Sequence, residues 1–351
     1  MLQAETARGH RRWWACVALA LVVSATAACG SDSSSADDKG GSEGASTETT
    51  AGAFPVTIEH KYGKTTIEQR PERVVTVGLT DHDSVLALGV VPVGVTEWFG
   101  EHPSATWAWA EDELGDGKAA IVGTSSEIGF EKVAAARPDV ILALYSSVTE
   151  SDYEKLSQIA PTVAQPKEYV DYGVPWFEQT LTVGKVLGES AKAETLVDEV
   201  KGKLADAKAQ HPEFEGATGM VAVPYEGTIS VYAPDDVRGR FMSDLGFIQP
   251  PEIADIAGED FSADLSEEQT ALLDVEALVW IVNDVAADAP KFDDQPLYAN
   301  LAVHQEGREV FVANLDEVGG ALSFQSVLSL PFLVDELVPQ LAEAVKGRTA
   351  G

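Results

Sequence analysis

The chain is poor in cysteine and in basic residues. It has only two cysteines among its 351 residues, and one of them, Cys16, lies in the N-terminal leader. With Cys29 as the other thiol, we expect no disulfide in the mature fold, so the packed core alone must stabilise it. Lys and Arg total 24 against 57 Asp and Glu, which gives a formal net charge of -33. Because such a charge repels phosphates, it disfavours a nucleic-acid partner and direct adsorption to anionic lipid.

Sequence motifs of enzymes and of metal sites are also missing. From residue 54 onward no Gly-x-Ser-x-Gly turn occurs, and the chain has no Gly-x-x-x-x-Gly-Lys-Ser/Thr loop, which disfavours catalysis. The six histidines are scattered, and neither His-x-x-His nor Cys-x-x-Cys spacing is present. We therefore expect no enzyme, no cofactor and no directly ligated metal. A metal site assembled from distant residues stays open as an alternative, which a metal titration without chelator would distinguish.

Residues 1–28 have the layout of a secretory signal peptide. Basic residues precede an apolar run over 13–23, which is shorter than the ~20 residues of a bilayer span, and small residues follow it. Cys29 comes next, as in a bacterial lipobox, although Thr26 stands where leucine is usual. We expect Cys29 to be the acylated N-terminus, with an ordinary cleavage site as the alternative. Residues 29–53 then form a flexible linker, since they are too poor in apolar side chains to fold.

From about residue 54 the sequence alternates short apolar runs with helical patterns. The runs at 74–79 and 140–144 are continuous, which is typical of parallel strands buried on both faces. Residues 174–210 have a helical pattern that Gly188 divides. We predict an α/β protein of two lobes, each with a mainly parallel sheet flanked by helices, joined by a rigid connecting helix. The predicted boundaries are an N-terminal lobe at 54–175, a connecting helical segment at 176–212 and a C-terminal lobe at 213–351.

A helix–turn–strand pattern occurs twice, at residues 131–144 and 268–281. Each copy starts with an acidic residue, Glu131 or Glu268, and ends in a buried-strand run. We interpret the pair as a pseudo-repeat that supports the two lobes, although two ordinary helix–strand units could coincide.

Several blocks of the chain, taken together, resemble the iron-siderophore binding proteins of bacterial ABC importers. They include RPERVVTVGLTDHD at 70–83, GFEKVAAARPDVILALYSS at 129–147, and the segments at 176–200, 265–282 and 321–345. The resemblance implies a class III periplasmic-binding-protein fold with the ligand in a cleft between the lobes, at the carboxyl ends of the strands. It further implies a lipid-anchored monomer on the extracytoplasmic face of the cell membrane, which passes a ferric siderophore to an ABC permease.

A ferric siderophore needs aromatic walls and a few hydrogen-bond donors, because its own oxygens already coordinate the iron. Few basic residues lie near the expected cleft, so we expect a neutral or cationic hydroxamate or mixed-type siderophore rather than an anionic triscatecholate. Haem or a corrinoid is the alternative ligand. For the aromatic candidates the competing interpretation is core packing or a cap on the lobe surface. For His82 and the two arginines it is a position exposed to water. The candidate ligand-binding residues are His82, Trp98, Phe99, Trp109, Tyr145, Tyr225, Tyr232, Arg238 and Arg240.

The resemblance also implies one acidic residue on the outer surface of each lobe that pairs with permease arginines. Glu131 and Glu268 occupy matching places in the pseudo-repeat, with Glu267 as a competing choice for the second position. Each carboxylate could instead serve only to complement its helix dipole.

Overall fold

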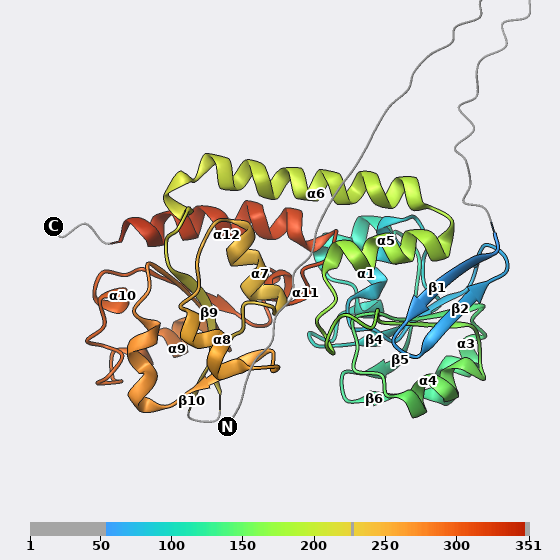
Figure 1. Cartoon of the computed structure of the whole chain (residues 1–351), viewed down its shortest axis with the longest axis horizontal. Helices are drawn as coiled ribbons and strands as arrows, with labels where there is room; N and C mark the ends of the chain where they lie inside the picture. Colours follow the sequence, from blue (N-terminus) through green and yellow to red (C-terminus); the bar gives the residue numbers. More distant parts are fainter. Residues whose placement is uncertain (1–53, 226–227, 348–351) are drawn as a thin grey trace, which may run out of the picture. The chain divides into compact units, whose positions relative to one another are not determined.

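The computed structural model describes residues 54–225 and 228–347. The predicted leader, the acylated Cys29 and the linker at 29–53 lie outside these residues. Two separate sheets, each with helices packed against it, confirm the predicted α/β class (Figure 1). Within the described residues, no helix combines the length and the apolar composition needed to cross a bilayer.

The N-terminal sheet has six strands in the order β6-β5-β4-β3-β7-β8. All its pairs are parallel except β5–β6, as predicted for strands that alternate with helices. The strands are β3 (Val74–Thr76), β4 (Gly94–Glu97), β5 (Ala120–Thr124), β6 (Glu127–Ile128), β7 (Val140–Ala143) and β8 (Thr162–Ala164). The helices of this lobe are α1 (Asp81–Ala87), α2 (Glu111–Leu114), α3 (Phe130–Ala136) and α4 (Glu150–Ser157), with 3-10 turns η1 (Pro103–Ala105) and η2 (Ala108–Ala110).

The continuous apolar runs of this sheet follow from its burial on both faces. Val74 and Leu142 pack on one face with α1 and α5 (Trp176–Leu187), whereas Val75 and Ile141 pack on the other with α3 and α4. Neighbouring residues of a strand point to opposite faces, so both must be apolar when helices cover both sides. An antiparallel hairpin that we did not predict, β1 (Val56–His60) and β2 (Gly63–Ile67), precedes this sheet.

The C-terminal sheet has five strands in the order β11-β10-β9-β12-β13. Its β9–β12 and β12–β13 pairs are parallel, but β10 and β11 are antiparallel, so it is more mixed than we predicted. The strands are β9 (Gly219–Tyr225), β10 (Thr228–Tyr232), β11 (Ser262–Leu265), β12 (Ala277–Val282) and β13 (Glu309–Ala313). The helices are α7 (Val237–Asp244), α8 (Pro251–Ala257), α9 (Val285–Asp288), α10 (Ala302–Gln305), α11 (Glu317–Phe324) and α12 (Ser329–Lys346), with 3-10 helices η3 (Pro212–Phe214), η4 (Glu267–Leu273) and η5 (Ala289–Phe292).

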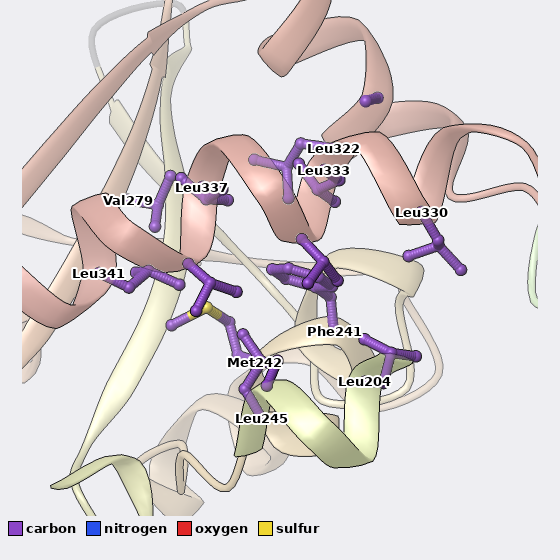
Figure 2. Packing of buried hydrophobic residues seen from close by; sticks show 14 of the residues in the cluster. Leu204, Phe241, Met242, Leu245, Val279, Leu322, Leu330, Leu333, Leu337 and Leu341 are labelled. Atoms are coloured by element: carbon purple, nitrogen blue, oxygen red, sulfur yellow. The ribbon is translucent and has the colours of Figure 1, made fainter. Parts of the chain in front are cut away.

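The connecting helix α6 (Ser190–Gln210) follows α5 after Gly188, whose positive φ of 71° ends α5. It packs against α5 at one end and α12 at the other (Figure 1). Figure 2 shows Leu204 of α6 near Phe241 and Met242 of α7, with the leucines of α12 above them. The buried leucines of α12 recur every three or four residues, which places them along one face of the helix. One hydrophobic cluster therefore fastens the connecting helix to the C-terminal lobe.

Candidate functional site

The carboxyl end of the N-terminal sheet carries a pocket of about 380 Å³, the N-terminal pocket. Its walls come from segments that follow β3, β5 and β7, because the carboxyl ends of parallel strands meet at one edge of a sheet. Hydroxyl and apolar side chains together line most of these walls, and Ser147 Oγ lies 2.8 Å from Tyr172 Oη. The lining includes Val77, Leu79, Thr124, Ser125, Ser126, Glu127, Ser146, Ser147, Asp152 and Tyr172.

The C-terminal sheet has two adjoining hollows, the C-terminal pockets, of about 230 and 610 Å³. They share Pro224 and Gln295. The smaller one lies at the carboxyl ends of β9, β12 and β13, where it is lined by Asn283 and Asn314. The larger one is lined by Tyr225, Thr228, Glu267, Thr270 and Leu297, among others. Tyr225 is 58% exposed and Leu297 is 55% exposed, so both present apolar surface to solvent.

The charged residues that line these pockets are mostly acidic: Glu127, Asp152, Glu267, Asp288 and Asp294. Among the described lining residues, Lys291 is the only base, and its ammonium nitrogen lies 2.6 Å from Asp288 Oδ1. No unpaired cation among them is therefore available to bind an anion.

The predicted aromatic residues of the loop at 98–109 surround a residue of the other lobe. Phe324, at the end of α11, is 2% exposed, and its ring centroid lies 5.4 Å from that of Trp98 and 5.5 Å from that of Trp109. Phe99 lies 5.8 Å from the same ring. Trp98 and Phe99 keep partial exposure. Trp109 stacks on the buried Trp107 and donates its indole hydrogen to Asp83 Oδ2 at 2.9 Å, so its polar atom is already used.

His82 is a buried residue of α1. It is 1% exposed, its Nε2 lies 3.0 Å from the Ala105 carbonyl oxygen, and burial lowers the pKa of its imidazole. The structure therefore places His82 neither in a cleft nor in water, the two positions that we had considered for it. Its neighbour Asp81 is fully buried and accepts hydrogen bonds from the backbone amides of Leu144 and Tyr145. Asp81 thus holds the segment after β7 against the β3–α1 connection.

Tyr145 and Val237 form a second contact between the lobes, next to Arg238 and Tyr232. Tyr145 is 2% exposed and packs with Val237 of α7. The guanidinium of Arg238 lies 3.7 Å from the Tyr232 ring centroid and pairs with Asp236, its Nε 2.7 Å from Asp236 Oδ1. Burial raises the pKa of the Tyr145 phenol, and the nearby Asp236 carboxylate adds to that effect. The ion pair with Asp236 means that the positive charge of Arg238 is already neutralised.

Arg240 also bridges the lobes, since its Nη1 donates to the Gly173 carbonyl oxygen at 2.8 Å. It keeps partial exposure, as does Tyr232. Within residues 54–225 and 228–347, no three His, Cys, Asp or Glu side chains are grouped so that they could hold a metal ion.

Comparison with known proteins identifies the family of this chain. Residues 74–312, which span both sheets, match the periplasmic binding protein family. The chain belongs to the periplasmic binding proteins. The Fe(3+)-citrate-binding protein YfmC of Bacillus subtilis is 24% identical over 74% of this chain and 78% of its own length. A putative ABC transporter substrate-binding lipoprotein of the same organism, YhfQ, is 25% identical over 92% of this chain and 95% of its own length.

Solved structures extend this comparison. A periplasmic solute binding protein from Mycobacterium smegmatis is 32% identical, with a TM-score of 0.73 over 83% of this chain and 98% of its own. Staphylococcus aureus SirA complexed with staphyloferrin B is 26% identical, with a TM-score of 0.67 over 82% of this chain and 99% of its own. The class III fold that we predicted for this periplasmic binding protein is confirmed by such neighbours.

Of the nine candidate ligand-binding residues, Tyr225 is the one in the lining of the described pockets. The hydroxyl and amide residues of the pockets were not among our candidates, because we searched for aromatic and basic side chains. Aromatic lining residues such as Phe130, Tyr172 and Tyr298 were also missed. A local signal was available: Ser146, Asn283 and Asn314 lie within three residues of the end of a parallel strand. The two acidic surface candidates are both exposed, Glu131 in the first turn of α3 and Glu268 in that of η4.

Proposed function

We propose that this periplasmic binding protein captures a ferric siderophore of the hydroxamate or mixed type and delivers it to an ABC importer for iron uptake. The carrying observation is that each lobe presents hollows at the carboxyl ends of its parallel strands, lined by hydroxyls, amides and apolar side chains. This is the position at which open α/β sheets bind ligands. Such a lining suits a chelate that already carries its iron.

The relatives support iron chelates as the ligand class. One curated relative is named for binding Fe(3+)-citrate, and a structural neighbour holds staphyloferrin B. In this chain Arg238 pairs with Asp236. Because no unpaired cation lines the described pockets, a strongly anionic ferric triscatecholate would leave its charge uncompensated. A neutral or cationic trihydroxamate avoids that cost.

We further propose that the protein is a non-catalytic monomer anchored through acylated Cys29 to the extracytoplasmic face of the cell membrane. The apolar leader before Cys29 and the relative named a lipoprotein support this location. Glu131 and Glu268 would then guide docking on the permease, because exposed charges steer and register an encounter more than they strengthen it.

Quenching of tryptophan fluorescence on titration with a small ligand panel tests the proposal. The panel has three ligands: ferrioxamine B (a cationic trihydroxamate), ferric enterobactin (an anionic triscatecholate) and haem. We expect the tightest binding with ferrioxamine B, and the iron-free ligand desferrioxamine B, as the control, should bind far more weakly. Tighter binding of ferric enterobactin would refute the charge argument. If haem bound stoichiometrically with a shift of its Soret band and no siderophore bound, the ligand would be a macrocycle and not a siderophore.

A further inference from the structure

A short segment at the end of α11 contacts the N-terminal lobe. Phe324 ends that helix, because Gln325 adopts the left-handed conformation with φ of 42°. Ser326 lies two residues further on, just before α12. We propose that Phe324 and Ser326 form an interlobe joint, which fixes how the pockets of the two lobes are oriented relative to each other.

Phe324 provides the apolar half of the joint. Besides Trp98, Phe99 and Trp109, it has Trp107 at 5.9 Å and His82 at 5.8 Å between ring centroids. These separations fall within the roughly 4.5–7 Å at which aromatic rings attract each other. The five rings all belong to the N-terminal lobe, so the side chain of Phe324 occupies a socket that the other lobe supplies.

A glycine lets α11 approach this socket closely. A Cβ atom placed on Gly320 would lie 2.5 Å from Cζ3 of Trp107, which is inside van der Waals contact. Gly320 lies one turn before Phe324 on α11. The Trp107 ring therefore rests directly on the backbone of α11, and the joint has two contacts along that helix.

Ser326 provides the polar half. Its hydroxyl donates to Asp83 Oδ2, the oxygen that also accepts the indole hydrogen of Trp109. Asp83 is fully buried and Ser326 is 4% exposed, so this charge-assisted hydrogen bond is shielded from water. Ser326 Oγ also accepts from the backbone amide of Ser329 at 3.0 Å, at the start of α12. One serine therefore ties the start of α12 to α1 of the other lobe.

Both halves of the joint are continuous with pocket walls. In the N-terminal lobe, Leu79 lines the pocket and lies four residues before Asp83 in the β3–α1 connection. In the C-terminal lobe, Asn314 lines the smaller pocket and lies between β13 and α11, the helix that carries Phe324. A change in the joint is therefore transmitted through short, ordered segments to both ligand-facing surfaces.

Distance measurement between the lobes tests the joint without any ligand. Spin labels would be attached at cysteines replacing Glu154 of α4 and Glu252 of α8, both exposed, in the full chain with Cys16→Ser and Cys29→Ser. We expect one narrow distance distribution in this background and a broader or shifted one after Phe324→Ala. Ser326→Ala should give a smaller change in the same direction. It removes only one hydroxyl, so it keeps the test informative even if Phe324→Ala fails to fold.

Phe292→Ala is the matched control for the distance measurement, because Phe292 is also 2% exposed but packs inside the C-terminal lobe. It should lower stability and leave the distance distribution unchanged. Phe292 also lines the smaller C-terminal pocket, so this control applies to the distances and not to the ligand Kd. An unchanged distribution in both Phe324→Ala and Ser326→Ala, or an equal change in Phe292→Ala, would overturn the joint.

The consequence for binding rests on the proposed function. If loss of the joint leaves about a tenth of the molecules correctly oriented, the apparent Kd for ferrioxamine B rises about tenfold. A changed distance distribution in a protein that binds no siderophore would reject the proposed function while supporting the joint. A changed distribution with an unchanged Kd would show that the joint does not orient the pockets.

Discussion

The two lobes place their aromatic side chains differently. The buried core of the C-terminal lobe includes Trp280, Phe292 and Tyr298, and Trp280 Nε1 donates to Tyr298 Oη at 2.9 Å. The buried core clusters on the two faces of the N-terminal sheet are aliphatic, and the tryptophans of that lobe gather around Phe324 instead. An aromatic cluster can therefore stabilise a lobe in one half of a protein and join two lobes in the other.

Trp280→Ala has the largest expected effect among the variants that test this difference between the lobes. Removing a fully buried indole costs roughly 3–5 kcal/mol in the free energy of unfolding, through lost transfer energy and the cavity left behind. The loss should be concentrated in the C-terminal lobe. Hydrogen exchange read by mass spectrometry should show lower protection in β9, β12 and β13, with β3 and β7 little changed. Equal loss of protection in both sheets would mean that the lobes unfold as one unit.

Asp81→Asn probes the N-terminal lobe through pH. Burial raises the pKa of Asp81 from 3.8 to about 6, against the opposing effect of the Leu144 and Tyr145 amides. The folded state therefore binds this proton more tightly than the unfolded state does. The stabilisation that protonated Asp81 adds to the free energy of unfolding is fully present below pH ~4 and is lost as pH rises through about 6. The change is about 3 kcal/mol. In urea titrations across this pH range, the free energy of unfolding of wild type should fall by that amount relative to Asp81→Asn. If the free energies of the two proteins changed with pH in parallel, the raised pKa of Asp81 would be contradicted.

The fold could be predicted because its determinants are local. Continuous apolar runs at 74–79 and 140–144 require cover on both faces, and the helical pattern around Gly188 identifies the connecting segment without knowledge of distant contacts. The antiparallel strands β10 and β11 were harder to foresee. They are short, and their pairing depends on a hairpin and on a partner about thirty residues away.

The surroundings of the aromatic candidates depended on contacts that local patterns do not specify. Ser326 meets Asp83 across 243 residues, and Phe324 enters a socket of rings from another lobe. The position of Trp109 in a loop was compatible with ligand contact, but Asp83 and Phe324 determine where its ring points. His82 had no local feature that distinguished a buried imidazole from an exposed one. The sequence therefore predicted where the loops lie along the chain, but it could not predict which residues they contact.

Placing one arginine in either lobe sharpens the comparison of the pockets. Ser125→Arg adds an exposed cation to the N-terminal pocket, and Thr228→Arg adds one to the larger C-terminal pocket. Each should shift preference from ferrioxamine B toward ferric enterobactin by about 1–2 kcal/mol, or roughly 5- to 30-fold in relative Kd, because a new opposite charge favours the anionic chelate. Ser125→Gln and Thr228→Gln control for side-chain size. A shift in only one lobe would identify the wall nearer the charged part of the ligand.

The smallest expected effect compares the two proposed docking residues. Glu131 is the only acidic residue in the first turn of α3, whereas Glu268 in η4 has the exposed Glu267 beside it. A neighbouring carboxylate can replace a lost one in a solvent-exposed contact, so Glu131→Ala should lower iron uptake several-fold and Glu268→Ala less. The Glu267→Ala, Glu268→Ala double variant should match Glu131→Ala. Uptake of labelled ferrioxamine measures this, alongside a ligand Kd that stays constant in the Glu131→Ala and Glu268→Ala single variants. The Kd of the double variant is measured separately, because Glu267 also lines the larger C-terminal pocket.

Glu199→Ala is the control for this last comparison, because it removes the same charge from an exposed position on α6. Uptake should remain at the wild-type level, since bulk charge changes little when one of 57 acidic residues is lost. Raising the salt concentration should narrow the difference between wild type and Glu131→Ala, because screening weakens exposed ion pairs. If Glu131→Ala instead weakened ligand binding, this carboxylate would act at the ligand and not at the permease.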